Sequence, residues 1–136
     1  MGFSGLSPPK KSQTITVRNA ATVEEMMRYK CLISARGNDR ASDISWKLAS
    51  GSVLFTALPR NIETWLMETK LVPDFHFVLI KDDWSDLEEK LDWCRKDWSV
   101  CENIAKNARD YMQQFSWEND FDIAKEVMME YLLRTC

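Results

Sequence analysis

A turn at residues 36–43 holds the residue types that bind a diphosphate group. It reads Arg36-Gly37-Asn38-Asp39-Arg40-Ala41-Ser42-Asp43. Gly37 allows a tight turn. The backbone amides at the end of the turn would form the N-terminus of the following helix, where they can bind an anion, and two arginines add positive charge. The pattern matches neither G-x-G-x-x-G nor G-x-x-x-x-G-K-[ST]. An ordinary capped turn, with Asp39 or Ser42 bonded to helix amides, explains the same residues equally well.

A second group of residues, further along the chain, is suited to bind a sugar: Arg60, Glu63, Trp65 and Glu68. Glu63 and Glu68 carry carboxylates, which accept hydrogen bonds from sugar hydroxyls. The alternative is that Trp65 and Met67 pack inward while the two acids face water. The residues alone favour neither interpretation.

Two adjacent acids, Asp82 and Asp83, follow Lys81. Adjacent carboxylates can carry out acid–base chemistry. Asp83 is also a suitable N-cap for a helix over 84–96, and this role is favoured.

Histidine and cysteine are too sparse for a metal centre. His76 is the only histidine, and the four cysteines, none of them in a C-x-x-C pair, are Cys31, Cys94, Cys101 and Cys136. No metal is therefore expected. His76 lies between two phenylalanines, which favours a structural role. Cys94 is expected in the last turn of one helix and Cys101 in the first turn of the next. Their Cα atoms should then lie within about 7 Å, the reach of a disulfide. Bonded and free thiols both remain open, because the outcome depends on the compartment.

Short strands and helices alternate through the first part of the chain and must position these residues. Strands are expected over 29–35, 52–57 and 75–80, and helices over 22–27, 41–50 and 62–70. Thr22 and Glu25 have the spacing of a capping box. The alternation indicates an α/β fold with a parallel, partial Rossmann-like sheet.

The last third of the chain is helical. Apolar stripes with helical spacing predict three helices, over 83–96, 100–115 and 121–132. The first 21 residues carry basic residues, no acid and a Ser-Pro-Pro sequence, which is typical of a flexible tail or a linker stub. One domain is expected over 22–136.

Composition excludes several classes of protein. The chain has 136 residues, of which 45% are hydrophobic and 29% charged, as in a globular domain with one core. The formal net charge of −3 argues against a nucleic-acid binder. No apolar run approaches the roughly 20 residues that span a bilayer.

Short strings, taken in order, match those of one enzyme family. They include YKCLIS at 29–34, GND at 37–39, AS at 41–42, ETW at 63–65, KDD at 81–83 and WC at 93–94. Over residues 22–133 the series resembles glycosyltransferase family 90. That family includes lipopolysaccharide-modifying transferases, capsule-associated proteins and protein O-glucosyltransferases.

The resemblance implies an enzyme of two Rossmann-like domains that takes a nucleotide sugar, UDP-linked, as its donor and needs no cofactor. The acceptor would be a glycan, a lipopolysaccharide or a protein. This chain resembles the C-terminal, donor-binding portion, with the acceptor half and the catalytic base upstream. Applied to the matching positions of this chain, the resemblance implies that the turn from Arg36 to Asp43 faces the donor diphosphate. It also implies that Glu63 and Glu68 lie near the nucleotide or the sugar. The compartment stays open: cytoplasm or membrane periphery for a bacterial-like member, the ER or Golgi lumen for a eukaryotic-like one.

The chain departs from the family's pattern at two places. The lipopolysaccharide branch has a Leu-Lys-Trp stretch where this chain reads Ile44-Ser45-Trp46. The O-glucosyltransferase branch has an arginine near the position of Asp43, so Arg36 or Arg40 would have to supply the charge here. The departure at Asp43 supports an alternative function, a Rossmann-like binding module without turnover.

Overall fold

A three-stranded parallel sheet forms the centre of the protein, as the sequence predicts. The computed structural model describes residues 20–35, 37, 41–57 and 63–135. The strands β1 (Cys31–Ser34), β2 (Val53–Thr56) and β3 (Val78–Leu79) lie in the order β1-β2-β3, and both pairings are parallel. Every residue of the central strand β2 is buried.

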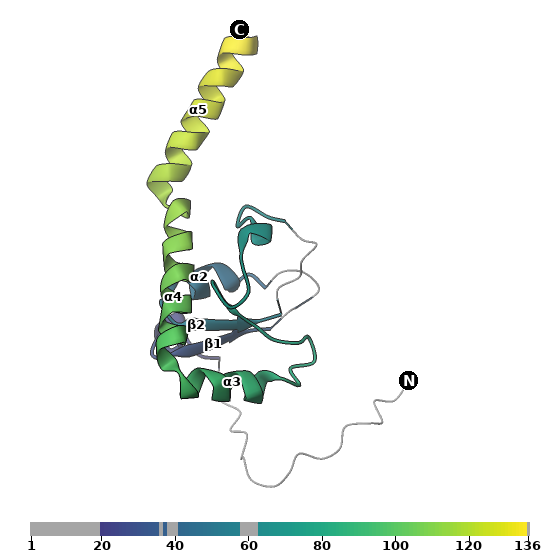
Figure 1. Cartoon of the computed structure of the whole chain (residues 1–136). Helices are drawn as coiled ribbons and strands as arrows, with labels where there is room; N and C mark the ends of the chain where they lie inside the picture. The colour runs from purple at the N-terminus through teal and green to yellow at the C-terminus, as the bar shows by residue number, and fades with distance from the viewer. Residues whose placement is uncertain (1–19, 36, 38–40, 58–62, 136) are drawn as a thin grey trace.

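Side chains that alternate along β2 face two different layers, because successive residues of a strand point to opposite faces. Val53 and Phe55 pack in one cluster with residues of α3 (Leu87–Lys96) and α4 (Trp98–Met112). Leu54 packs on the other face with α2 (Ile44–Ala49) and with Ala108 of α4. The long helix α4 therefore contributes to both clusters, and Figure 1 shows it across the end of the sheet, with α2 and α3 on opposite faces.

The predicted capping box is confirmed at the first helix, α1 (Val23–Met26). The Thr22 hydroxyl accepts a hydrogen bond from the Glu25 amide at 3.2 Å, and the Glu25 carboxylate accepts one from the Thr22 amide at 2.9 Å. The two bonds satisfy donors that the start of a helix leaves without a partner.

The predicted approach of Cys94 and Cys101 is confirmed. Their Cα atoms lie 5.9 Å apart and the two sulfurs are bonded. Both side chains are buried beside β2. Since Cys94 ends α3 and Cys101 begins α4, the disulfide joins two helices that cover one face of the sheet.

Several predicted boundaries are wrong, each for a local reason. Where a helix is expected over 62–70, the described residues 63–70 form a loop that ends in one 3₁₀ turn, η1 (Glu68–Lys70), because side chains bond the backbone inside it. The helix expected from residue 84 begins at Leu87. Trp84 has φ +60°, a left-handed conformation that cannot be part of a right-handed helix. The N-cap of this helix is Asp86, and Asp83 is not the cap. The helix expected over 100–115 is α4, which starts two residues earlier, at Trp98, and ends at Met112.

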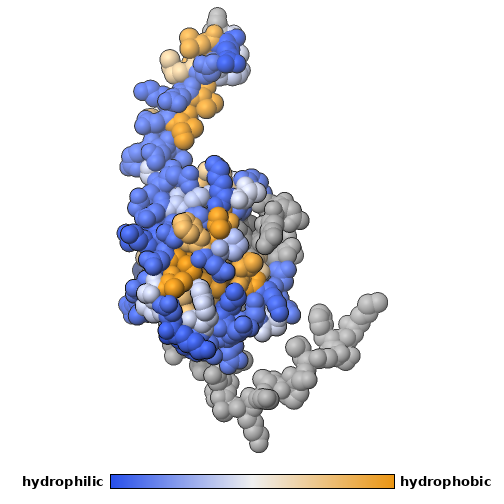
Figure 2. All heavy atoms as spheres, in the orientation of Figure 1, coloured by the Kyte–Doolittle hydropathy of each residue, from blue (hydrophilic) through white to orange (hydrophobic). Residues whose placement is uncertain are grey.

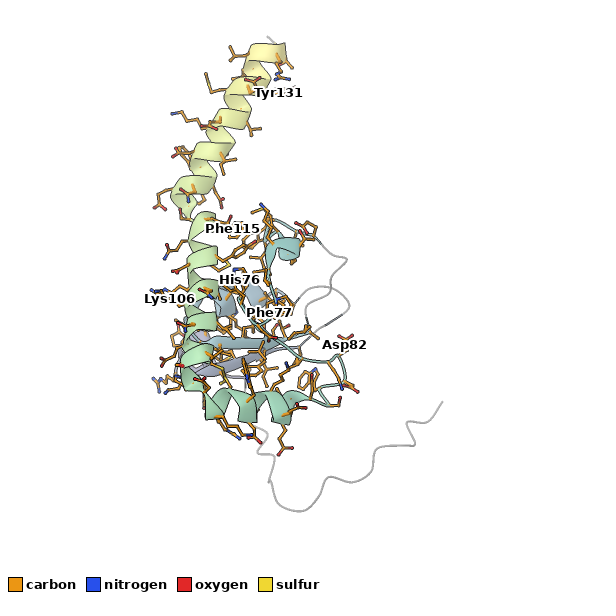
Figure 3. All side chains as sticks on the ribbon, viewed as in Figure 1. His76, Phe77, Asp82, Lys106, Phe115 and Tyr131 are labelled. Carbon is orange, nitrogen blue, oxygen red and sulfur yellow. A yellow bond between two sulfur atoms is a disulfide. The ribbon has the colours of Figure 1, made fainter. Side chains whose placement is uncertain are left out.

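The last helix differs most from expectation. After the 3₁₀ turn η2 (Gln113–Phe115), α5 (Trp117–Thr135) runs for 19 residues and buries none of them. Figures 1 and 2 show it extending away from the sheet with apolar side chains along it, and Tyr131 lies far out on it (Figure 3). The apolar stripe predicted for this segment is therefore exposed. Among the described residues, no helix is long and apolar enough to cross a membrane.

Candidate functional site

The two segments that hold the predicted binding residues follow neighbouring strands of the sheet. Ser34 ends β1, Thr56 ends β2, and the two are partners in the parallel register. The segments that follow them hold the predicted diphosphate turn and the predicted sugar-binding carboxylates. In open parallel sheets ligands bind beyond the carboxyl ends of the strands, which is where both segments begin.

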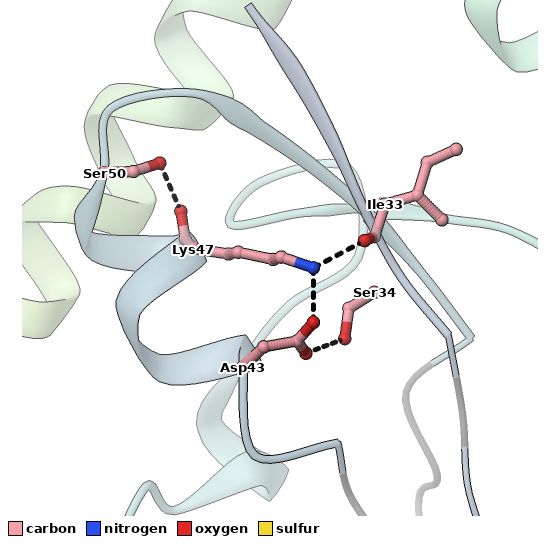
Figure 4. Close-up of polar contacts among 5 residues, drawn as sticks. All are labelled: Ile33, Ser34, Asp43, Lys47 and Ser50. Carbon is pink, nitrogen blue, oxygen red and sulfur yellow. Dashed lines mark hydrogen bonds and ion pairs between the residues drawn. The ribbon is translucent and has the colours of Figure 1, made fainter. Parts of the chain in front are cut away.

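A buried polar network ties the start of α2 to β1 (Figure 4). The Asp43 carboxylate accepts a hydrogen bond from the Ser34 hydroxyl at 2.5 Å and forms an ion pair with Lys47. The Lys47 ammonium also donates to the carbonyl of Ile33 at 2.7 Å. Lys47 is only 5% exposed. A buried ammonium needs such partners, since water no longer solvates it.

This network changes the interpretation of Asp43. The residue occupies the N-cap position of α2 but makes no side-chain cap bond, because Ser34 and Lys47 engage its carboxylate. The N-cap position belongs to Asp43 rather than to Ser42, and the predicted cap by Asp39 lies outside the described residues. Sequence analysis missed Lys47, although its spacing of four from Asp43 is that of a helical ion pair.

The remaining residues of the predicted diphosphate turn divide into two groups. Gly37 and Ser42 are exposed, and Ala41 packs against the cluster that contains Leu48. The others lie outside the described residues: Arg36, Asn38, Asp39 and Arg40.

The two predicted sugar-binding carboxylates brace the segment after β2. Glu68 accepts bonds from the Thr64 amide and hydroxyl, both at 2.7 Å, and is 3% exposed. Glu63 is exposed and accepts bonds from the Thr69 amide and hydroxyl at 3.2 and 3.0 Å. The interpretation in which both acids face water while Trp65 packs inward is wrong, because Glu68 is buried and Trp65 is 57% exposed.

Tyr111 of α4 fixes the same segment from the side of the core. Its hydroxyl lies 2.7 Å from the carbonyl oxygen of Leu66 and 3.1 Å from that of Met67. Met67 has φ +52°, a left-handed conformation that costs a non-glycine residue free energy. Burial raises the pKa of the Tyr111 hydroxyl, and the charges of Glu63 and Glu68 add to the effect. The hydroxyl therefore stays protonated and able to donate.

His76 has the structural role that the sequence favours. Its Nδ1 accepts a hydrogen bond from the Val72 amide at 2.9 Å, and its ring packs against Phe75 and Tyr111. Burial lowers the pKa of its imidazole, which keeps Nδ1 free to accept. His76 lies beside α4 in Figure 3.

The acids after β3 are exposed and serve the turn before α3. The Asp83 carboxylate accepts a bond from the Ser85 amide at 3.1 Å, and this bond lowers the pKa of the carboxyl. The Asp86 carboxylate accepts one from the Lys81 amide at 2.9 Å. In the described part of the chain, no three His, Cys, Asp or Glu side chains group to hold a metal ion.

The parallel sheet, with helices packed on both of its faces, defines an α/β protein with a partial Rossmann-like sheet. The model of Glycosyl transferase family 90 matches residues 9–134, and the chain belongs to that family. The resemblance inferred from the sequence is thereby confirmed.

Individual relatives extend the comparison. The chain is 36% identical to O-glucosyltransferase LpsA of Dichelobacter nodosus over 115 residues, which are 84% of this chain and 36% of that protein. It is 30% identical to Uncharacterized protein 179R of Invertebrate iridescent virus 6 over 136 residues, 91% of this chain and 12% of that protein. The chain thus spans about a third of LpsA and a smaller share of the viral protein.

Proposed function

We propose that this chain is the nucleotide-sugar-binding portion of a family 90 glycosyltransferase. The donor is UDP-linked, and its diphosphate lies against the turn from Gly37 to Asp43. Glu63 and Glu68 lie near the nucleotide or the sugar. The acceptor is a glycan, a lipopolysaccharide or a protein.

The register of Ser34 and Thr56 is the observation that carries the proposal. Since these partners end two neighbouring parallel strands, the diphosphate turn and the carboxylate-braced segment start side by side. A nucleotide sugar has a diphosphate, which a turn with free amides can bind, and a sugar and a base, which polar side chains can bind. Two adjacent segments of these two kinds therefore suit it. The family match supplies the reaction class.

The ion pair between Asp43 and Lys47 supports a diphosphate at this turn. A free carboxylate there would repel a phosphate, whereas one paired with an ammonium carries no net charge as a unit. The attracting charge then comes from Arg36 or Arg40. Guanidinium groups suit this role because they donate two parallel hydrogen bonds to phosphate oxygens.

Transfer requires an acceptor held in line with the donor, and fixing that geometry accounts for much of the rate. By the proposal, this chain holds the donor, and the acceptor and the catalytic base come from the upstream part of a longer enzyme. The braces from Glu63 to Thr69 and from Glu68 to Thr64 keep the segment after β2 in shape before the donor arrives.

Isothermal calorimetry with UDP and UDP-glucose, with and without Mg²⁺, tests the proposal. UDP-glucose is chosen because the LpsA relative is named an O-glucosyltransferase. Arg36→Ala with Arg40→Ala should weaken UDP binding by about 10- to 100-fold, the range for lost bonds to a charged group. Arg109→Ala, an exposed arginine of α4, is the control and should leave the affinity unchanged. Unchanged affinity in the double variant would contradict the charge assignment.

The second candidate function is a binding module without turnover. The acid at position 43, where the resemblance expects an arginine, is the observation that favours it. Such a module binds UDP-glucose but does not release UDP from it. Measuring UDP release alongside binding separates the two functions.

A further inference from the structure

A cavity lies between the segment after β2 and the start of α5. Its volume is about 340 Å³, and its lining residues are Trp65, Met67, Gln114, Phe115, Asp120 and Ile123. This volume falls in the range of small-ligand sites, roughly 300–1,000 Å³. Phe115 points from η2, the turn after α4, toward the segment that carries Trp65 (Figure 3).

Trp65 forms an exposed but firmly supported wall of this cavity. Its ring packs edge-on against Phe115, with centroids 5.4 Å apart, and Phe115 packs in turn against Tyr111 at 5.6 Å. Tyr111 holds the carbonyl groups of Leu66 and Met67, the residues that follow Trp65. The exposed Trp65 indole is therefore carried by a loop that has a left-handed residue at Met67 and is fixed by the Tyr111 hydroxyl, and such backbone conformations cluster at functional sites.

The polar groups of the cavity include two hydrogen-bond acceptors, on Gln114 and Asp120. Gln114 donates its side-chain amide to the carbonyl of Tyr111 at 2.9 Å, which leaves its side-chain oxygen as an acceptor. No hydrogen bond or ion pair joins the Asp120 carboxylate to any other described residue. The group that enters the cavity therefore donates hydrogen bonds and carries no negative charge itself, because the Asp120 carboxylate would repel a phosphate.

We infer that this cavity binds the pyranose ring of a sugar. One face of the ring, with its C–H groups, lies on the Trp65 indole, and its hydroxyls donate to Asp120 and Gln114. The choice of a sugar follows from the proposed function, on which this inference rests. Donor sugar and acceptor sugar share this chemistry, and the experiment distinguishes them.

Fluorine NMR of the 136-residue chain labelled with fluorotryptophan provides the readout. The chain has six tryptophans, and Trp65→Phe assigns the signal of interest. Methyl β-D-glucopyranoside, UDP and UDP-glucose are titrated separately. The Trp65 signal should shift with methyl glucoside, while the Trp117 signal, from an exposed tryptophan outside the cavity, should not. A shift at lower concentration of UDP-glucose than of methyl glucoside assigns the site to the donor sugar. The reverse order assigns it to the acceptor.

Matched variants test the two walls of the cavity. Trp65→Ala and Asp120→Ala should each weaken binding of methyl glucoside about tenfold, which corresponds to about 1.4 kcal/mol. Trp117→Ala and Glu118→Ala, neighbours on α5 that do not line the cavity, should leave it unchanged. Thermal unfolding checks that each variant folds. If Trp65→Ala does not fold, Asp120→Ala, on an exposed helix face, still carries the test.

Two results would overturn the inference: a Trp65 signal that neither sugar shifts, or sugar affinity that Asp120→Ala leaves intact. Failure here and failure of the proposed function are distinguishable. UDP binding without any effect of sugars on Trp65 removes this site and leaves the donor proposal. A Trp65 shift with methyl glucoside in a chain that does not bind UDP removes the donor proposal and leaves a sugar site.

Discussion

Lys47 pairs with the carboxylate of Asp43, four residues before it, and donates to the carbonyl of Ile33 in the neighbouring strand. One ammonium thus joins the first turn of α2 to the end of β1. These contacts hold together the two described ends of the segment that contains Gly37 and Ser42. We therefore expect Lys47 to help position the proposed diphosphate turn without contacting the ligand itself.

Replacing this lysine should destabilise the fold. Lys47→Met leaves the half-buried Asp43 without its cation, and the free energy of unfolding should fall by about 3 kcal/mol, the lower end of the range for breaking a buried pair. Adding Asp43→Asn to Lys47→Met should recover part of the loss, because the uncompensated charge is then gone. Urea unfolding followed by circular dichroism measures both.

The control for this prediction is Lys106→Met on the exposed side of α4. Its effect should stay within about 0.5 kcal/mol, as for most surface substitutions. Equal effects of Lys47→Met and Lys106→Met would show that the ion pair contributes nothing to stability.

The sequence predicted what local patterns determine. Apolar runs placed β1 and β2, the spacing of Thr22 and Glu25 placed a capped helix, and the connection between two helices placed Cys94 beside Cys101. Each of these depends on residues close together in the chain. The parallel order of the strands followed from their alternation with helices.

Features that depend on distant contacts escaped prediction. Lysine is ordinarily a surface residue, so nothing local showed that Lys47 is buried. The strand expected over 75–80 starts only at Val78, because Asp74 has φ +58° and its amide bonds the Phe77 carbonyl, which turns the chain. An apolar stripe shows that α5 has an apolar face, but not whether another surface covers it.

The disulfide between Cys94 and Cys101 predicts a specific labelling pattern. Alkylation of the denatured, unreduced protein should modify Cys31 and Cys136 only, and reduction should expose two further thiols to the reagent. Intact mass spectrometry counts the labels. Four labels without reduction in protein made under oxidising conditions would exclude the bond.

Removing the disulfide should also cost stability. Cys94→Ala with Cys101→Ala should lower the free energy of unfolding by about 2.5 kcal/mol, the value of the loop-entropy estimate for a short closed loop. Cys31→Ala, which leaves the bond intact, is the control and should lose less. A double variant as stable as the parent would show that the cross-link does not constrain the unfolded chain.

Tyr111→Phe should loosen the segment that carries Trp65. The change removes the hydroxyl bonded to the Leu66 and Met67 carbonyls, so the free energy of unfolding should fall by about 1–1.5 kcal/mol. Tyr131→Phe, on the exposed helix α5, is the control and should have almost no effect. Faster amide hydrogen exchange at residues 64–67 in the Tyr111 variant alone would locate the change in this loop.

The raised pKa of Tyr111 gives the same variant a signature at high pH. Above the ordinary pKa of tyrosine, 10.0, the unfolded chain loses the phenol proton while the folded chain keeps it. Stability from this group is therefore complete below that pH and is lost as pH rises toward the folded-state pKa. Urea midpoints between pH 9 and 11 should fall less steeply in Tyr111→Phe than in the parent. Parallel slopes would contradict the role of this hydroxyl.

His76 should make stability depend on pH on the acid side. Burial holds the pKa of its imidazole below the ordinary 6.5, so below that pH the unfolded chain binds a proton that the folded chain excludes. The contribution is therefore present above pH 6.5 and is lost as pH falls through the folded-state pKa. Protonation also ends the bond that Nδ1 accepts from the Val72 amide. Urea midpoints should decrease between pH 7.5 and 5.5.

The matched variant for this prediction is His76→Asn, whose side-chain oxygen can accept the Val72 amide in place of Nδ1 but does not titrate. Because His76 is the only histidine of the chain, the variant should lose most of the pH dependence in that window. The urea midpoint should then change more steeply with pH in the parent than in the variant. The two midpoints should differ least at the acid end of the range. An unchanged slope in His76→Asn would show that other groups, such as the exposed carboxylates, produce the dependence.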